Sequence, residues 1–342
     1  MKAAVVILNW NGKKFLEQFL PAVVANCPEW ARVVVADNAS SDDSVSWVKE
    51  YYPEVHLIIN DQNFGFAGGY NEALKQLDDE YYILLNSDVE VTPNWLEPLI
   101  DQLTNSPKLA ALQPKILAWH NKTQFEYAGA AGGFIDKNYF AFCRGRIFET
   151  FENDHGQYND FIEVAWATGA CLVVRRSAYW EVGGLDDTFF AHMEEIDLCC
   201  RLKNSGYSVG YLGTSTVYHV GGGTLNKQSP FKTYLNYRNN LALIVKNHFG
   251  SNLFLKLFYR MLHDGVSGVV HLLKGERKQV WAIIKAHFHF YGRLPRLMKQ
   301  RSELRTRLCE PNRKGFYSGS IVWDYFVERR KSFPDLNNGF EN

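Results

Sequence analysis

Residues 81–88 read Tyr-Tyr-Ile-Leu-Leu-Asn-Ser-Asp, so an apolar run stops at a polar triplet that ends in Asp88. A run this short and this apolar is typical of a strand buried on both faces, as in a parallel sheet flanked by helices. Ligands of such sheets bind just beyond the carboxyl ends of the strands. A carboxylate placed there can hold a divalent cation against a diphosphate, because hard cations prefer oxygen ligands. The alternative is an Asp that caps a surface turn.

Three further segments carry polar groups where apolar runs end. Asn9 follows the first run, without the Gly-x-Gly-x-x-Gly of a dinucleotide-binding fold. Asp37 ends the second run, and its carboxylate can accept a hydrogen bond from a base N–H or a ribose hydroxyl, or can form an Asx turn. Residues 63–71 are rich in glycine, which lets the backbone approach a ligand at a helix N-terminus suited to phosphate. A purely structural turn would have the same composition.

An acidic group opens a helix-like pattern at Glu194. Asp197 lies four residues before Arg201, a spacing that predicts an ion pair on an outer face. Glu195 instead heads an apolar stripe made of Leu198, Cys199 and Leu202. A carboxylate that points along an apolar face is partly desolvated, which raises its pKa and suits a general base. We therefore predict Glu195 as the base.

A histidine, His219, ends a later strand-like segment and is followed closely by three glycines. A lone histidine in such a segment is usually structural, but a neutral imidazole here could also complete a metal site. Both interpretations stay open on the sequence alone.

The elements that must position these residues follow from alternating patterns in residues 1–118. Strands are expected at 3–8, 32–36, 56–59 and 81–85, and helices at 13–24, 43–51, 68–77 and 93–103. This alternation predicts a parallel α/β sheet with right-handed crossovers. Thr92 and Pro93 are expected to start the fourth helix. Farther along, we expect a loop or insertion over 119–162, a strand over 164–175 interrupted at Thr168-Gly169, and a helix over 194–204.

The net charge of zero hides a strong asymmetry. Residues 1–230 hold 17 Lys and Arg against 29 Asp and Glu, a net charge of −12, whereas residues 231–342 hold 20 against 8, a net charge of +12. We expect a main domain at 1–230 and a helical, basic, aromatic C-terminal region at 231–342. An anionic membrane surface is the expected partner of that region, and pairing with the acidic domain or contacts in a homo-oligomer are the alternatives. No nucleic-acid partner is expected.

The six cysteines show no metal-ligand spacing, and Cys171 and Cys199 sit in apolar patterns expected in the core. The first apolar stretch is too short for a signal peptide, and no stretch reaches the length of a membrane span. We expect a cytoplasmic protein, soluble or peripheral on the inner face of the cell membrane.

Taken in order, these segments resemble family 2 glycosyltransferases of the GT-A fold, and most of all the rhamnosyltransferase-like enzymes of polysaccharide assembly. The resemblance covers residues 3–240. It implies that Asp37 contacts the nucleotide base and that the nucleotide sugar is bound by Asn9, Asp37, Asn63, Gly65, Asn71 and Asp88. It implies Glu195 as catalytic base, Asp88 and His219 as metal ligands, and an acceptor region at Thr168, Gly169 and Glu194. Two positions depart from the family pattern: Asn86 replaces the first Asp of the Asp-x-Asp pair, and Glu195 replaces an Asp.

The activity implied is a single inverting displacement, with Mg²⁺ or Mn²⁺ offsetting charge on the departing nucleoside diphosphate. The donor would be a dTDP- or UDP-linked sugar, with rhamnose as the candidate, and the acceptor a hydroxyl of a glycan or lipid-linked glycan. The alternative is a catalytically degenerate protein that binds sugar nucleotides or carbohydrate. A pyrophosphorylase is disfavoured because no glycine-rich basic loop follows the first strand, and an NAD-dependent dehydrogenase because its glycine fingerprint is missing.

Overall fold

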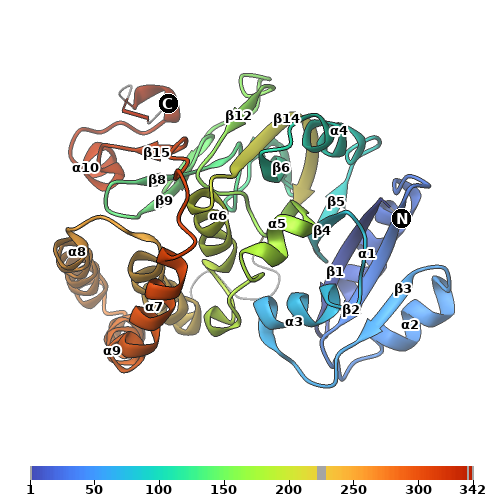
Figure 1. The fold of residues 1–342 in the computed structure, drawn as a ribbon, viewed down its shortest axis with the longest axis horizontal. Coiled ribbons are helices and arrows are strands. Elements are labelled where there is room, and N and C mark those ends of the chain that lie inside the picture. The colour runs from blue at the N-terminus through green and yellow to red at the C-terminus, as the bar shows by residue number, and fades with distance from the viewer. Residues whose placement is uncertain (1, 222–228, 337–338, 341–342) are drawn as a thin grey trace.

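The computed structural model describes residues 2–221, 229–336 and 339–340. Its main element is a ten-stranded sheet (Figure 1). Four adjacent strands run parallel in the order β3 (His56–Ile59), β2 (Ala31–Asp37), β1 (Ala3–Asn9) and β4 (Tyr81–Asn86). The four predicted strands are therefore confirmed, each to within one residue at either end.

Burial on both faces explains why the inner strands β1, β2 and β4 are mainly apolar, whereas β3, at the edge, has both of its end residues exposed. Along β1, Ala3, Val5 and Ile7 pack in one core cluster with α1 (Lys13–Ala25) and α4 (Glu97–Asn105). The alternate side chains of β1 point to the other face and pack with α3 (Gly65–Leu74). Because side chains alternate along a strand, both sets must be apolar when helices cover both faces. The remaining helix of this half is α2 (Ser44–Tyr51).

Two predicted helix starts are wrong. α4 begins at Glu97 and not at Pro93, because Asn94 has a φ of 56° and Thr92 donates its hydroxyl to the Thr216 carbonyl at 2.8 Å. α3 begins at Gly65, so the glycine pair Gly68-Gly69 lies inside the helix. A Cβ on Gly69 would come within 2.9 Å of the Asn38 side chain, so this glycine lets α3 pack closely on the end of β2.

The other half of the main sheet is mixed. β13 (Cys171–Arg175) runs antiparallel to β4 on one side and to β6 (Leu109–Ala118) on the other. β14 (Ser208–His219) is parallel to β6, and short strands pair antiparallel at the margins: β5 (Val89–Val91), β7 (Asn121–Phe125) and β12 (Phe161–Glu163). The strand predicted over 164–175 forms only from Cys171 onward. Cys171 and Cys199 are buried in the core, as predicted.

A second sheet, which the sequence did not predict, contains strands of two to four residues. Its order is β11 (Thr150–Phe151), β10 (Arg146–Ile147), β9 (Ala141–Cys143), β8 (Gly133–Asp136) and β15 (Phe316–Tyr317). Most of it comes from the region predicted as a loop or insertion. β15 belongs to the C-terminal region and pairs parallel to β8, so this region is not wholly helical.

The C-terminal region packs on the rest of the protein through helices. They are α7 (Pro230–Asn247), α8 (Leu253–Leu273), α9 (Arg277–Arg305) and α10 (Ile321–Phe326), and α7 lies against α6 (Glu194–Asn204) and α9. Shorter elements are α5 (Arg176–Glu181) and two 3₁₀ turns, η1 (Asp187–Phe189) and η2 (Phe333–Asp335). These helices lie at the end of the molecule opposite α2 and β3 (Figure 1). The division at residues 230 and 231 stays a prediction, because α7 does not stand apart from α6.

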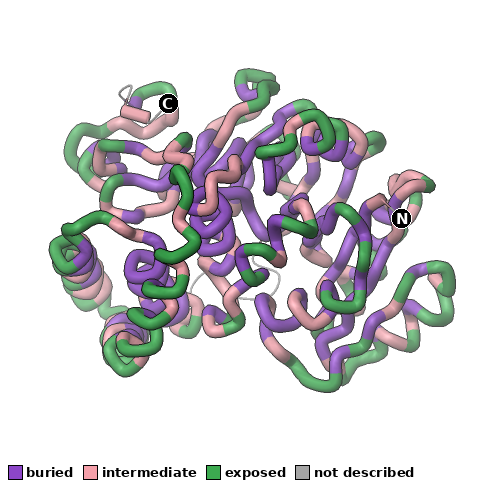
Figure 2. Tube along the Cα trace, in the orientation of Figure 1, coloured by how far each residue is buried: buried purple, intermediate pink, exposed green. Residues whose placement is uncertain are grey.

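Burial differs between these helices. Most of α7 is buried, whereas α8 and α9 present many exposed residues along their outer sides (Figure 2). None of the helices within residues 2–221 and 229–336 is both long and apolar enough to cross a membrane.

Candidate active site

The carboxyl ends of the parallel strands bring two predicted nucleotide ligands together. In the β1–β2 register Asn9 lies opposite Asp37, and both side chains are buried. Asn9 Nδ2 donates to Asp37 Oδ1 at 2.8 Å, and the Ser40 backbone N–H donates to Asp37 Oδ2 at 2.8 Å. The Asp37 carboxylate therefore holds the turn after β2, which is its structural role. Its two oxygens retain lone pairs that could accept from a ligand.

Asn63 joins the same edge through a residue that the sequence did not single out. Asn38 Nδ2 donates to Asn63 Oδ1 at 2.9 Å and to the Gly65 carbonyl at 3.0 Å. Asn63 Oδ1 also accepts from the Gly65 N–H at 2.8 Å. These amide contacts fix the start of α3 against the end of β2, and only the neighbouring position of Asn38 beside Asp37 could have indicated this.

The first amides of α3 are not available to a phosphate, in contrast to the expectation for this glycine-rich helix start. The N–H groups of Phe66 and Ala67 point at the Phe190 carbonyl, at 2.8 and 3.4 Å. Gly65 has a φ of 74°, and a Cβ there would lie 2.6 Å from the Phe190 ring. The glycine is therefore required by contact with the segment before α6, not by an exposed anion site.

Asn71 has its side chain directed away from the strand ends. Its Nδ2 donates to the Leu185 carbonyl at 2.7 Å, and its Oδ1 accepts from Tyr179 Oη at 2.6 Å and from the Leu185 N–H at 3.1 Å. These bonds occupy its amide, so Asn71 holds the turn after α5. The structure does not place it with the other predicted nucleotide ligands.

Asp88 and His219 face each other, although 131 residues separate them in the chain. The antiparallel pairing of β5 with β14 sets Val89 opposite His219, so Asp88 lies next to the end of β14. His219 Nε2 is 3.1 Å from Asp88 Oδ1, and Asn86 Nδ2 is 3.5 Å from the same nitrogen. The structure thus brings together the two predicted metal ligands.

Glu126, which the sequence analysis missed, lies on the other side of the imidazole. It follows β7 at the end of the β6–β7 hairpin, and its Oε2 lies 3.3 Å from His219 Nδ1. Burial alone would lower the pKa of His219, but its contacts with Asp88 and Glu126 outweigh burial and raise it to about 10. Burial would likewise raise the pKa of Glu126, but the contact with His219 prevails and lowers it.

The donor atoms at this place suit a divalent cation that a substrate completes. Within residues 2–221 and 229–336, no group of three or more His, Cys, Asp and Glu side chains forms a closed metal cage. Asp88 and His219 supply one carboxylate and one imidazole, with the Asn86 amide beside them. Mg²⁺ is commonly bound by one or two carboxylates together with substrate phosphates and water. These residues therefore fit such an ion. The glycines Gly222 and Gly223 lie outside the described residues.

Glu195, the second residue of α6, has one carboxylate oxygen without a partner in the described part of the chain. Its Oε2 is buried and has no hydrogen-bond partner among the described residues. Burial raises the pKa of Glu195 to about 7. Burial and the neighbouring charge of Glu195 also raise the pKa of Glu194 well above its ordinary value. A carboxylate with a pKa near neutrality and a free lone pair can accept a proton from a bound hydroxyl.

The predicted acceptor segment lies beside this carboxylate. A Cβ on Gly169 would lie 3.7 Å from Glu195 Cβ, so the two residues are adjacent. Thr168 is fixed by Gln113, whose Oε1 accepts the Thr168 N–H at 2.9 Å. The carbonyl of Ala170, which follows Gly169, accepts a hydrogen bond from the Asn86 N–H at 3.0 Å. Residues 168–170 thus connect the base position with the segment that carries Asp88.

The backbone before α6 is held in an uncommon conformation. Phe190, His192 and Met193 have φ values of 67°, 67° and 73°, a region that costs a non-glycine residue about 1–3 kcal/mol. α7 holds this segment from the other side. Asn239 Nδ2 lies within 3.0 Å of three carbonyl oxygens in residues 189–192, and Arg238 Nη2 donates to the Phe189 carbonyl at 2.9 Å. The C-terminal region therefore positions the start of α6.

Asp197 does not lie on an outer face, so that expectation is wrong. It pairs with Arg201 at 2.8 Å as predicted, but α7 covers it and its side chain is fully buried. Lys246 Nζ at 2.8 Å and Asn247 Nδ2 at 2.8 Å complete its contacts. With its oxygens so occupied, Asp197 is a structural residue that joins α6 to α7.

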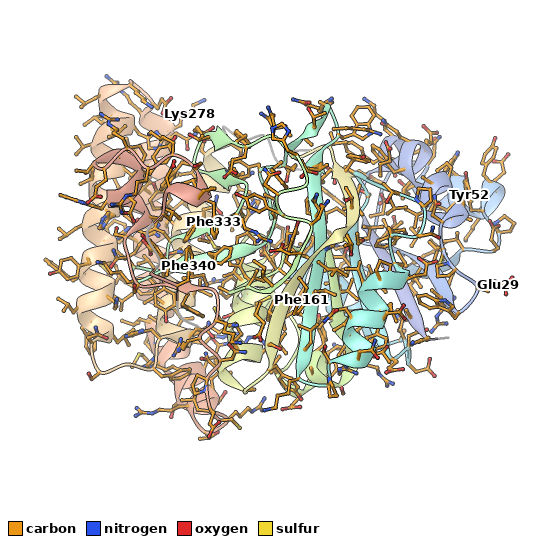
Figure 3. The ribbon with its side chains drawn as sticks, turned by 90° about the horizontal axis from the view of Figure 1, so that it is seen from above. Glu29, Tyr52, Phe161, Lys278, Phe333 and Phe340 are labelled. Atoms are coloured by element: carbon orange, nitrogen blue, oxygen red, sulfur yellow. The ribbon has the colours of Figure 1, made fainter. Side chains whose placement is uncertain are left out.

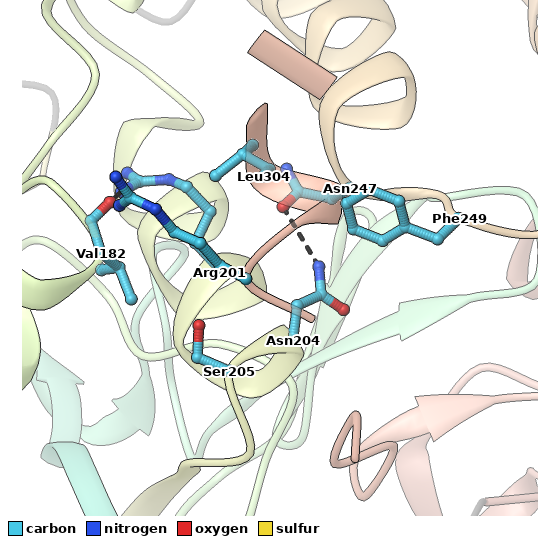
Figure 4. Close-up of a pocket in the computed structure, with 8 residues that line it drawn as sticks. Val182, Arg201, Asn204, Ser205, Asn247, Phe249 and Leu304 are labelled. Atoms are coloured by element: carbon cyan, nitrogen blue, oxygen red, sulfur yellow. Dashed lines mark hydrogen bonds between the residues drawn. The ribbon is translucent and has the colours of Figure 1, made fainter. Parts of the chain in front are cut away.

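A cavity at the far end of α6 is too small for a substrate. It lies where the ends of α6, α7 and α9 meet, and Asn204 Nδ2 donates to Asn247 Oδ1 there at 3.4 Å (Figure 4). Its volume is about 10 Å³, room for about one water molecule. The candidate active site is the strand edge with Asp88 together with the start of α6, because the predicted metal ligands meet there and Glu195 Oε2 has no partner among the described residues.

Comparisons with known proteins identify the family and the fold. The model of glycosyl transferase family 2 matches residues 4–183, so the chain belongs to this family. Glu195 and His219 lie beyond the matched residues. The fold is the GT-A fold, and the protein is a glycosyltransferase that uses a nucleotide sugar.

Two relatives are rhamnosyltransferases. N-acetylglucosaminyl-diphospho-decaprenol L-rhamnosyltransferase of Mycobacterium tuberculosis is 27% identical over 63% of this chain and 75% of its own length. Rhamnosyltransferase WbbL of Escherichia coli is 23% identical over 63% of this chain and 82% of its own length. The crystal structure of GalNAc-T7 with UDP, GalNAc and Mn²⁺ superposes with a TM-score of 0.59 at 14% identity. That match covers 96% of this chain and 57% of the GalNAc-T7 chain, and it supports the fold alone.

Proposed function

We propose that this protein is an inverting glycosyltransferase that moves a sugar, with rhamnose as the candidate, from a dTDP- or UDP-linked donor to a hydroxyl of a glycan or lipid-linked acceptor. Its place would be cell-surface polysaccharide synthesis at the inner face of the cell membrane. The observation that carries the proposal is Glu195, a residue adjacent to Gly169 whose buried Oε2 has no hydrogen-bond partner among the described residues. The names of the two rhamnosyltransferase relatives support the choice of sugar and of acceptor class.

Two groups of residues would perform separate roles, one binding the nucleoside of the donor and the other removing the proton of the acceptor. Asn9, Asp37 and Asn63 bind the nucleoside, since they lie where β1, β2 and α3 meet. Glu195 Oε2 accepts the proton of the acceptor hydroxyl as that oxygen attacks the anomeric carbon from the side opposite the nucleoside diphosphate. A single displacement of this kind inverts the anomeric configuration. Gly169 leaves room for the acceptor because it adds no side chain beside the base.

Asp88 and His219 would hold a divalent cation, Mg²⁺ or Mn²⁺, together with the donor diphosphate. When bound, the ion supplies positive charge that offsets the charge growing on the leaving group. His219 can act as a ligand through Nε2 only after it loses its proton from that atom. Glu126, at Nδ1, fixes the orientation of the ring, as carboxylates commonly do for metal-bound histidines. Because Asn86 is neutral, Asp88 would be the residue of this pair that offers a carboxylate to the ion.

Asp88→Ala should weaken nucleoside-diphosphate binding in Mn²⁺ but change nucleoside binding little. The variant loses the carboxylate that would bridge protein and cation, whereas Asn9 and Asp37 still bind the nucleoside. Calorimetry with the diphosphate and with the nucleoside, each in Mn²⁺ and in EDTA, measures the difference. Equal diphosphate affinity of the unaltered protein in Mn²⁺ and in EDTA would contradict the cation site.

Glu126→Gln should lower Mn²⁺ affinity by about 10–100-fold, the usual effect of removing a carboxylate behind a metal-bound histidine. Titration of Mn²⁺ in the presence of the nucleoside diphosphate measures it. Glu90→Gln is the matched control, because Glu90 lies on β5 nearby but bonds to Trp119 and Lys122 instead. If both variants bound Mn²⁺ as tightly as the unaltered protein, Glu126 would have no such role.

A catalytically degenerate protein that binds sugar nucleotides remains the second candidate, because Asn86 departs from the family pattern. Release of nucleoside diphosphate from dTDP- and UDP-sugars, with and without lipid-linked glycan acceptors, distinguishes the two. A degenerate protein would shift its melting temperature with a donor but release no diphosphate under any condition.

A further inference from the structure

α8 buries two charged side chains, Arg260 and Asp264, beside Leu253 and Leu257, while most of its apolar side chains face outward. Arg260 and Asp264 are buried, 2.9 Å apart, and Asp264 also contacts His287 of α9 at 3.1 Å. Arg260 further lies over the Phe140 ring, at 4.2 Å from its centre. These contacts fix which side of the helix faces the protein. Surface helices of globular proteins normally have the opposite arrangement.

The outward side of α8 carries an apolar stripe at helical spacing. Its members are between 49% and 83% exposed: Phe254, Phe258, Leu262, Val266, Val269 and Leu273. They lie three or four residues apart, so they form a continuous row along the helix. A contiguous apolar row of this length is rare on a monomeric protein surface and marks an interaction site.

α9, which packs on α8, adds an exposed aromatic and basic row of its own. Lys278 and Trp281 are repeated seven residues later as Lys285 and Phe288, and all four are exposed. A seven-residue interval returns a helix to nearly the same side, so the two lysines and two aromatic rings share one face. Lys278 lies among the helices at the end of the molecule opposite Glu29 and Tyr52 (Figure 3).

Charge in this region is almost entirely positive. Residues 253–300 contain nine Lys and Arg against two acidic residues. Of the two, Asp264 is buried and Glu276 contacts His271 at 2.5 Å. The outer surface of α8 and α9 therefore combines apolar, aromatic and basic groups with little opposing charge.

We infer that α8 and α9 form a docking surface for an anionic lipid bilayer. The stripe on α8 enters the boundary between headgroups and acyl chains, and Lys278 and Lys285 lie over the anionic headgroups. α8 lies along the surface and does not cross it, in agreement with the absence of a membrane-spanning helix from the described part of the chain. The inference names the lipid class and the contact surface for the peripheral location proposed above, and vesicle binding tests it without any donor or acceptor.

A second copy of the chain fits this surface less well. An isologous contact would bring the basic rows of two α9 helices together, and like charges at close range repel. Pairing with the acidic domain of the same chain accounts for other basic residues. Lys246 of α7 contacts Asp186 and Asp197, whereas Lys278 and Lys285 are exposed and the ammonium of Lys285 lies 5.4 Å from the centre of the Tyr234 ring, not against a carboxylate.

Cosedimentation with vesicles tests the inference. The full chain should bind vesicles of phosphatidylcholine with 30 mol% phosphatidylglycerol, and binding should fade between about 0.1 and 1 M salt as the screening length falls from roughly 10 to 3 Å. The double variant Val266→Asp/Val269→Asp, and separately Lys278→Glu/Lys285→Glu, should each lower the bound fraction at least about tenfold. Ile59→Asp, at the exposed end of β3 on the opposite side of the molecule, is the matched control and should bind normally.

Circular dichroism of each variant establishes that the fold is retained, which is expected because the altered side chains are exposed. Equal binding to neutral and anionic vesicles, or no binding to either, overturns the inference. The unaltered protein could instead form a dimer in light scattering without binding vesicles. If Val266→Asp/Val269→Asp abolished that dimer, the surface would be assigned to a second copy of the chain. Vesicle binding does not depend on sugar transfer, so a protein that transfers no sugar could still bind vesicles. The two proposals can therefore be rejected independently.

Discussion

Glu195→Gln should reduce turnover by about 10²–10⁴-fold while leaving donor binding nearly unchanged, since that is the usual contribution of a general base. Gln keeps the size of the side chain but cannot accept the proton of the acceptor hydroxyl. Steady-state rates at saturating acceptor, with donor affinity from calorimetry, measure both quantities. Near-normal turnover in this variant would show that Glu195 is not the base.

The pH dependence gives an independent signature of the same carboxylate. Burial raises the pKa of Glu195 to about 7, above the value of about 4.3 for Glu in an unfolded chain. The base must be ionised, so kcat/KM should fall as the pH drops below about 7. Because the folded pKa is the higher one, stability is lost as the pH rises through it. Glu195→Gln should therefore melt at a higher temperature than the unaltered protein at pH 8.5, and at the same temperature near pH 4.

Asp197→Ala should lower the free energy of unfolding by about 3–5 kcal/mol, the cost of removing one member of a buried ion pair. The substitution removes the carboxylate that both Arg201 and Lys246 contact, and these two side chains stay buried. It also removes the acceptor of the hydrogen bond from Asn247 Nδ2. Denaturant unfolding measures the change.

The control for this prediction is Glu72→Ala. Glu72 and Lys75 pair at 2.6 Å on the surface, where such pairs contribute about 0–1 kcal/mol. A loss below about 1 kcal/mol for Asp197→Ala, similar to the control, would show that the link between α6 and α7 is not a stabilising one.

The parallel half of the sheet could be predicted because three of its four strands, β1, β2 and β4, are buried on both faces. Four uninterrupted apolar runs separated by helical patterns leave few arrangements, and the carboxyl ends of parallel strands share one edge. That rule accounts for the contact between Asn9 and Asp37, which the family resemblance had assigned to one nucleotide site. The contact between Asp88 and His219 was expected from the family resemblance, and the β5–β14 register accounts for it.

Other features depend on contacts that no local pattern contains. The position of Glu126 follows from the β6–β7 hairpin, whose irregular register sets it against His219. Asn71 resembled a ligand by its place in a glycine-rich segment, but its amide is used by the turn after α5. Asp197 was assigned to an outer face because its own helix gives no sign that α7 covers it. The short strands of the second sheet lack enough residues for a period of two to be detected.

The hydrogen bonds from α7 to the segment before α6 couple the C-terminal region to the candidate active site. Asn239 bonds to carbonyls of residues 189–192, and the Phe190 carbonyl in turn accepts from the start of α3. The donor half, the base and the C-terminal helices are therefore linked through one short stretch of backbone. The C-terminal third therefore cannot be exchanged independently of the rest: replacing it with that of a relative would change the orientation of Glu195, so the proposed acceptor choice and the proposed membrane attachment would change together.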